Sequence, residues 1–350
     1  MSEEEKERLD ELEKEIRSEI QNLKKDINKT LQSSKSTMED LLKTKEGSKI
    51  PLITAEKNSF LDFFGNAPTI KKLDINLEKS NLIKSIAPFL KEVNLQAIFL
   101  YVSILKMLNV DISESFIQQA FKTMEKQTHQ KIFTSPYDEK PDTINIFYGL
   151  ATVLELIQYG NVDFIDLPKI TNYIQKEVKY FDAIELHKNY YLLNCFNMLI
   201  RLNQNITINR QTILEEISKL DLSALPEPDP IRDLYEAVSC IILINPNDIS
   251  ENIKSKYYNI LMNFLNNHEI SDLTITELAQ ASLIIDLLGL KEDAEDLIEK
   301  LLKKIKDKTI FFNTKEIEED FSWESDKLAL LVELRMLFYS LLVNLQYDLL

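Results

Sequence analysis

Two kinds of helical segment alternate along this chain from about residue 79 onward. Segments of the first kind, such as 143–158, are apolar on every side. Segments of the second kind, such as 167–178, are apolar along one face only. A helix that is apolar all round lies in the interior, whereas a helix with one apolar face lies at the surface. The alternation therefore predicts an inner layer of helices covered by an outer layer.

The spacing of the interior segments indicates a repeated helical hairpin. Their starts lie about 40 to 50 residues apart, which is typical of stacked helical pairs. They are 94–108, 143–158, 189–202, 231–244, 275–288 and 326–345. With 80–93 as the opening outer helix, we expect six outer and six inner helices. Because the inner helices need neighbours on every side, we predict an all-α fold in which they close into a ring, an α/α toroid. An open superhelix of helical pairs remains the alternative.

Composition disfavours several classes of function. The chain has only five glycines, whereas about 7% is typical, and phosphate-binding loops depend on glycine. Its formal net charge of −16 disfavours nucleic acid as a partner, because phosphate binding needs a basic face. The basic run 303–308 lies among acidic residues and is typical of a solvated helix face.

The chain also lacks the marks of secretion or membrane insertion. Its first residues are acidic, unlike a signal peptide, and no apolar run reaches about 18 residues without a charge. Cys195 and Cys240 lie in apolar runs, as buried cysteines do in a reducing compartment. We therefore expect a soluble, cytoplasmic protein with no transmembrane segment.

The first 46 residues are highly charged and contain an apolar stripe with an eleven-residue repeat. Such a narrow stripe cannot bury itself alone, so it must pair with a second copy, a partner helix or the body of its own protein. We expect a coiled coil that joins a second copy or a partner protein. A solvated helix without a partner is the alternative. The residues of the stripe are Leu9, Leu12, Ile16, Ile20, Leu23, Ile27 and Leu31.

Three parts of the chain follow from these patterns. We assign 1–46 to the coiled-coil helix, 47–78 to a linker and 79–350 to the toroid domain. Within the linker, the segment NSFLDFFG (58–65) holds three phenylalanines and must be covered. We expect it to dock on its own domain, and the alternative is a short binding motif for another protein.

The stretch PDTINIFYGLATVLELIQYGNVDFIDLPKITNYIQK (141–176) resembles the repeat of the prenyltransferase and squalene/terpene cyclase-like α/α toroids. In that repeat an Asp-Thr pair opens an inner helix rich in Tyr and Ala, and the following outer helix carries an I..YI pattern. The resemblance implies a toroid over roughly 79–350. It also implies chemistry on isoprenoid substrates.

The catalytic motifs of that family are missing. Its zinc site uses an Asp-x-Cys pair, but Leu193 and Val238 stand two residues before the two cysteines. The Asp-x-Asp-Asp acid of the cyclases is absent, and Trp323 is the only tryptophan, so the cyclase Gln…Trp repeats are absent too. A zinc pair of His187 and Cys195 would need further ligands. We therefore expect no catalytic residue, no metal and no other cofactor.

Polar residues near the starts of the inner helices form the remaining candidate site. In a ring of parallel inner helices these starts meet at one mouth, where two carboxylates could serve as acid and base in sugar chemistry. Helix capping explains the same residues without a ligand, and we prefer that explanation. The candidates are Asp142, His187, Asp233, Glu236, Glu277 and Asp326.

The inner helices also carry many aromatic side chains, such as Tyr148 and Tyr191. These rings either line an open lumen or fill it, and filling is the preferred expectation. We expect a non-catalytic interaction or scaffold protein. The alternatives are an enzyme or carrier for an isoprenoid-like lipid and, thirdly, a helical-ring glycosidase. A cavity of several hundred Å³ at the mouth would favour a ligand-binding function.

Overall fold

The computed structural model describes residues 95–108, 110–135, 137, 139–160, 162–226, 228–245, 249–312 and 323–347. All of them belong to one compact unit of the chain, Asn58–Leu350. The predicted coiled coil (1–46), the linker (47–78) and the first outer helix (80–93) lie outside the described residues. Within them, the chain is all-α apart from one short hairpin, which confirms the all-α part of the predicted fold.

The odd-numbered helices are buried around most of their surface, whereas the even-numbered helices are buried along one face. In α3, every residue except Gln96 and Lys106 is buried, whereas in the even-numbered helix α6 buried positions fall on one face, as at Ile170 and Ile174. The odd-numbered helices are α3 (Leu95–Met107), α5 (Thr143–Leu156), α7 (Leu186–Arg201), α9 (Pro230–Ile244), α11 (Ile275–Leu287) and α13 (Trp323–Gln346). The even-numbered helices are α4 (Glu114–Lys126), α6 (Leu167–Lys179), α8 (Arg210–Lys219), α10 (Glu251–Asn267) and α12 (Glu295–Phe312).

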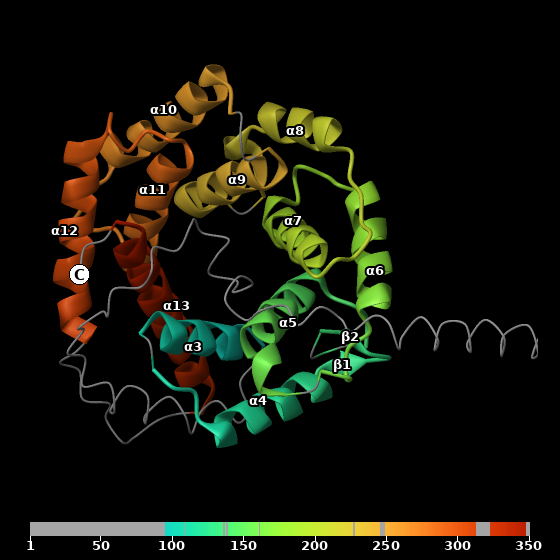
Figure 1. The fold of residues 1–350 in the computed structure, drawn as a ribbon. Coiled ribbons are helices and arrows are strands. Elements are labelled where there is room, and N and C mark those ends of the chain that lie inside the picture. The colour runs from blue at the N-terminus through green and yellow to red at the C-terminus, as the bar shows by residue number, and fades with distance from the viewer. Residues whose placement is uncertain are drawn as a thin grey trace, which may run out of the picture. The chain divides into compact units, whose positions relative to one another are not determined.

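The contacts among the odd-numbered helices run in a closed order. Helix α3 contacts α5, α5 contacts α7, α7 contacts α9, α9 contacts α11, α11 contacts α13, and α13 contacts α3. The even-numbered helices lie outside this set (Figure 1). Helix α4 packs on α3, α6 on α7, α8 and α10 on α9, and α12 on both α11 and α13. The odd-numbered helices therefore have neighbours on several sides, as their apolar surfaces require.

Side-chain caps fix where several helices begin. Asp142 accepts a hydrogen bond from the backbone N–H of Asn145 at 2.8 Å, and Asp166 caps α6 in the same way. Thr274 and Glu277 form a reciprocal capping box at the start of α11. These side chains satisfy backbone donors that a first helical turn leaves without partners.

A two-stranded hairpin lies between α4 and α5. Its strands are β1 (Thr128–His129) and β2 (Ile132–Phe133), and they pair antiparallel. The turn residues Gln130 and Lys131 have φ of 50° and 67°. The sequence did not predict the hairpin, because neither turn residue is the glycine that usually adopts such a conformation. Phe133 is fully buried against Gly149 of α5 and thus anchors the hairpin to an inner helix.

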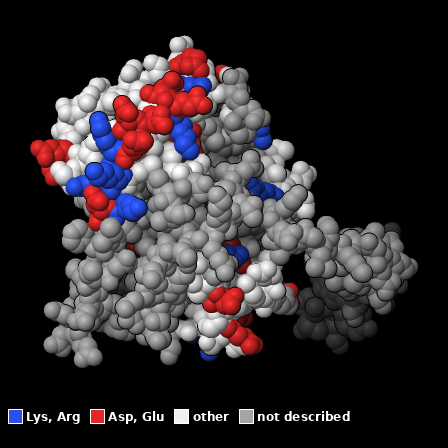
Figure 2. All heavy atoms as spheres, turned by 60° about the vertical axis from the view of Figure 1, so that its left-hand side comes forward, with Lys and Arg blue, Asp and Glu red and all other residues white. Residues whose placement is uncertain are grey.

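One face of the described region carries many charged side chains (Figure 2). Acidic and basic side chains lie side by side on the face turned forward in Figure 2, as expected for solvated outer helices. None of the described helices combines the length and the hydropathy that a membrane crossing would require.

Candidate functional site: a cavity lined by the inner helices

A cavity of about 650 Å³ is lined by residues from all six odd-numbered helices. Helix α5 contributes Ile144, Phe147 and Tyr148, and α7 contributes Tyr190 and Tyr191 one turn after His187. Residues three and four positions apart lie on one face of a helix. The same spacing recurs in α3, α9 and α13, so each of these helices turns one stripe of side chains toward the cavity.

The lining residues of α3, α5, α7, α9 and α11 lie in or next to the first two turns of their helices. Helix α13 contributes residues from its middle, including Arg335 and Tyr339. The amino ends of five helices therefore surround one space. Peptide dipoles give such ends a partial positive charge, and carboxylates are stabilised near them.

Aromatic rings make up much of the cavity wall and pack edge to face. The ring of Phe147 lies 5.0 Å from that of Tyr191, and the hydroxyl oxygens of Tyr148 and Tyr191 are 3.0 Å apart. Burial raises the pKa of Tyr148, Tyr190 and Tyr191, so their hydroxyls stay neutral at physiological pH. We expected aromatic side chains to fill the lumen. They pack against one another and still leave a cavity.

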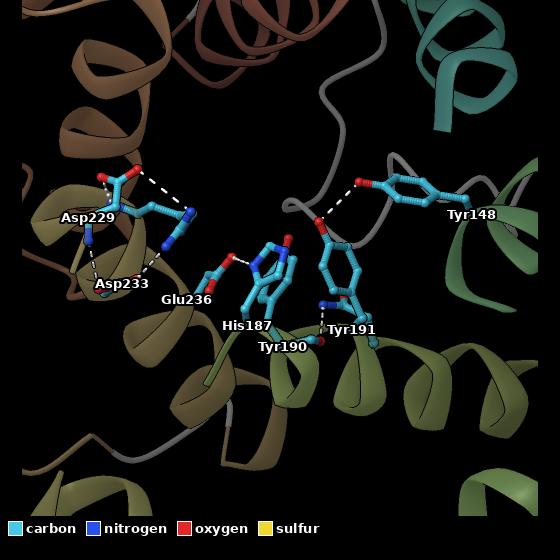
Figure 3. Close-up of polar contacts among 9 residues, drawn as sticks. Tyr148, His187, Tyr190, Tyr191, Asp229, Asp233 and Glu236 are labelled. Atoms are coloured by element: carbon cyan, nitrogen blue, oxygen red, sulfur yellow. Dashed lines mark hydrogen bonds and ion pairs between the residues drawn. The ribbon is translucent and has the colours of Figure 1, made fainter. Parts of the chain in front are cut away.

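His187 and Glu236 form the closest polar contact at the cavity wall (Figure 3). Nδ1 of His187 lies 2.6 Å from Oε1 of Glu236. The Glu236 side chain is only 4% exposed, whereas that of His187 is 48% exposed. The ring of Tyr191 meets the imidazole edge-on at 5.0 Å. A neutral imidazole that donates from Nδ1 leaves Nε2 as an acceptor. The pair can therefore accept a proton or a hydrogen bond from a ligand.

A second polar group stands at the start of α9. The guanidinium of Arg232 lies 3.8 Å from a carboxylate oxygen of Asp229 and 3.2 Å from one of Asp233. Asp233 also accepts a hydrogen bond from the backbone N–H of Asp229 at 3.0 Å. Asp233 is 3% exposed and lies outside the cavity lining, so its role is to hold Arg232 and the first turn of α9 in place.

Only some of the candidate residues from the sequence analysis line the cavity. His187, Glu236 and Glu277 line the cavity, and Glu277 is engaged in its capping box. Asp142 caps α5, and neither Asp142 nor Asp233 lines the cavity. Asp326 lies within α13, but its side chain is outside the described part of the structure.

Sequence reasoning missed two arginines of the cavity wall, Arg232 and Arg335. The available signal was an arginine within a helix whose residues are mostly apolar. Arg335 is exposed, and among the described residues its guanidinium has no hydrogen bond or ion pair. It lies close enough to Tyr148 and Tyr339 to lower their pKa, against the larger effect of burial.

The two cysteines are buried, and both are free thiols. Sγ of Cys195 faces the carbonyl oxygen of Thr143 at 3.8 Å, while His187 is paired with Glu236. The two side chains that sequence spacing suggested as a possible zinc pair thus have different partners. No cluster of three or more His, Cys, Asp or Glu side chains suited to a metal occurs in the described part of the chain.

Comparison with family models, with curated proteins and with solved structures finds no match to this chain.

Proposed function

We propose that this protein is a non-catalytic interaction module built on an α/α toroid, and that the toroid holds a small organic ligand in its central cavity. The closed order of contacts from α3 to α13 and back supports the toroid. An open superhelix has two free ends, so its first and last inner helices would not meet.

The cavity is the observation that carries the ligand-binding part of the proposal. Its volume of about 650 Å³ falls within the range of roughly 300 to 1,000 Å³ that small-molecule sites occupy. Such sites combine apolar and aromatic walls with a few convergent polar groups. Here the walls are tyrosines and phenylalanines, and the polar groups include His187, Glu236 and Arg335.

An isoprenoid-like lipid is the second candidate ligand, and the aromatic rings favour it. The charged side chains in the same wall oppose it, because an acyl chain would leave them without solvent. A lipid as the tightest ligand would make the protein a carrier or an enzyme of lipid metabolism.

A ligand screen with a blocked cavity tests the proposal. Small polar molecules, amines, sugars and lipids are screened against the full chain by ligand-observed NMR. Ile144→Trp places a large ring in the cavity wall, and Tyr180→Trp changes a position that is 82% exposed and away from the cavity. Hits should bind the wild type and Tyr180→Trp equally and bind Ile144→Trp at least about tenfold more weakly. Thermal unfolding shows that both variants are folded. The proposal fails if no compound binds, or if Ile144→Trp leaves every hit unaffected.

We further propose that the amino-terminal stripe of Leu9, Ile16 and Ile20 assembles the protein through a coiled coil. It rests on the sequence pattern, since these residues lie outside the described structure. Light scattering of the full chain and of a chain that begins near residue 50 tests it. We expect a larger oligomer for the full chain, and equal monomeric masses would refute self-association through this stripe.

A further inference from the structure

One carboxylate oxygen in the cavity wall lacks a partner. Glu236 is 3% exposed, and its Oε1 is paired with His187. Its Oε2 is buried and has no hydrogen-bond partner among the described residues. Buried polar atoms in native proteins almost always have a partner, because an unpaired one loses its hydration without compensation. An unpaired carboxylate oxygen at a cavity wall therefore points to a ligand that donates a hydrogen bond.

The surroundings of Glu236 favour a charged donor over a neutral one. Hydrogen bonds that involve two ions are stronger than neutral ones, and a buried carboxylate gains most from an opposite charge. Tyrosine rings surround the same space, and aromatic faces attract cations. Glu236 also lies within electrostatic range of Tyr148, Tyr191 and Tyr339. A cation beside Glu236 would share the cavity with these three tyrosine rings.

Neither arginine of the wall donates a hydrogen bond to Oε2 of Glu236. Arg232 is paired with Asp229 and Asp233, and its charge also acts on Glu236. Arg335 is exposed, so water and salt screen its repulsion of a bound cation, whereas the attraction of the buried Glu236 is screened less. The net charge of −16 also raises the concentration of cations near the protein.

We propose that the cavity selects a small organic cation with a primary or secondary ammonium group, which donates a hydrogen bond to Oε2 of Glu236 among the tyrosine rings. This inference rests on the proposed ligand-binding function and names the class of ligand. His187 is a positioning residue, because its contact with Oε1 fixes the carboxylate and leaves Oε2 for the ligand.

Three probes of nearly equal shape test the charge preference on the full chain. Tryptamine carries an ammonium group, tryptophol a hydroxyl group and indole-3-propionate a carboxylate. Their dissociation constants are measured by ligand-observed NMR titration at fixed salt. Tryptamine should bind about tenfold or more tightly than tryptophol, the difference expected for a charge-assisted hydrogen bond. Indole-3-propionate should bind most weakly.

Matched substitutions assign the preference to one carboxylate. Glu236→Gln keeps the shape and removes the charge, so the tenfold advantage of tryptamine should disappear. Glu277→Gln makes the same change at a lining carboxylate whose Oε2 is already bonded to Thr274, and its effect should be smaller. Arg335→Gln removes a repulsive charge and should leave tryptamine binding equal or slightly tighter. Urea unfolding confirms that each variant is folded.

Each contrary outcome overturns the inference. Equal or tighter binding of tryptophol would indicate a neutral polyol-like ligand, and tightest binding of indole-3-propionate would make Arg335 the anchor of an anion. Undiminished tryptamine selectivity in Glu236→Gln, or no binding of tryptamine, would also overturn it. The ligand-binding proposal itself is judged separately, by whether any compound in the broader screen is lost on blocking the cavity with Ile144→Trp.

Discussion

Nζ of Lys106 lies 2.5 Å from Oε2 of Glu155, a carboxylate whose side chain has no exposed surface. The two residues come from neighbouring inner helices, α3 and α5, near the carboxyl ends of both. The Lys106 side chain is 25% exposed, so the ammonium reaches the buried carboxylate from the edge of the core. This ion pair ties the two helices together at the end opposite the cavity lining.

Removing Lys106 should destabilise the fold, because the buried carboxylate of Glu155 loses the ammonium with which it is paired. Lys106→Met removes the ammonium that is paired with the buried Glu155, and we expect a loss of about 3 kcal/mol in the free energy of unfolding. The double variant Lys106→Met/Glu155→Leu should recover much of that loss, because an apolar pair carries no desolvation penalty. Urea unfolding measures both, with Lys122→Met, at an exposed position, as the control. A double variant less stable than Lys106→Met would contradict this account.

Gly149 should resist the substitution that helices usually favour. Ala in place of Gly stabilises a helix interior by about 1 kcal/mol. Here an added Cβ would collide with the buried ring of Phe133, and overpacking costs about 1 to 3 kcal/mol. We therefore expect Gly149→Ala to lower stability by about 1 kcal/mol or more. The same substitution in a Phe133→Leu background should cost less, and a double-mutant cycle measures the coupling. Additive effects would show that the hairpin does not press on α5.

Asp142 should behave as a helix cap without a role in ligand binding. Its Oδ2 accepts from the backbone N–H of Asn145 at 2.8 Å and from the side-chain amide of Asn145 at 2.9 Å. Asp142→Ala should cost about 1 kcal/mol, whereas Asp142→Asn should cost much less, because Asn caps helices as well as Asp does. Both variants should bind cavity ligands like the wild type. A loss of binding in the folded Asn variant would place Asp142 in the site after all.

Buried tyrosines should make the protein unfold in alkali. Burial raises the pKa of Tyr257 and of Tyr339 to about 12, from the usual tyrosine value of about 10. The unfolded chain releases these protons above pH 10, while the native state keeps them, so the stability present below pH 10 is lost as pH rises toward 12. Each such tyrosine contributes a loss of up to about 1.4 kcal/mol per pH unit in that window.

Tyr257→Phe tests this dependence. The variant loses the hydrogen bond from the Tyr257 hydroxyl to the carbonyl of Ile217, so its stability at pH 8 should fall by about 1 kcal/mol. Above pH 10, the free energy of unfolding of the variant should fall less steeply with pH than that of the wild type. The difference in slope corresponds to about one proton released on unfolding. Urea unfolding at pH 8, 10 and 11 gives the slopes, with the exposed Tyr180→Phe as the control. An unchanged slope for Tyr257→Phe would contradict the assignment.

The sequence predicted the helices well because their signals are local. Segment 143–158 was expected as an inner helix, and α5 runs Thr143–Leu156 with Asp142 as its cap and a short 3₁₀ turn, Ile157–Tyr159, at its end. Apolar periodicity and capping depend only on near neighbours in the chain. The hairpin before α5 was not predicted from the sequence. Its turn residues lack glycine, and its contact with α5 through Phe133 and Gly149 joins residues distant in the chain.

The site was harder to predict because it depends on how each helix is rotated about its own axis. Asp233 and Glu236 both lie in the first two turns of α9, yet only Glu236 lines the cavity. Packing against α7 and α11 sets that rotation, and the pattern of α9, which is apolar on most sides, leaves it open. His187 and Glu236 are 49 positions apart, so their contact could not be derived from spacing.

Helix α13 is the last helix that the structure describes, and it contacts both α11 and α3. Because ribosomes synthesise the amino end first, five of the helices that line the cavity, α3 to α11, are made before α13. Until α13 emerges, the surfaces of α3 and α11 that contact it stay uncovered. A chain that ended before Trp323 would lack the side of the cavity that α13 supplies, including Arg335 and Tyr339.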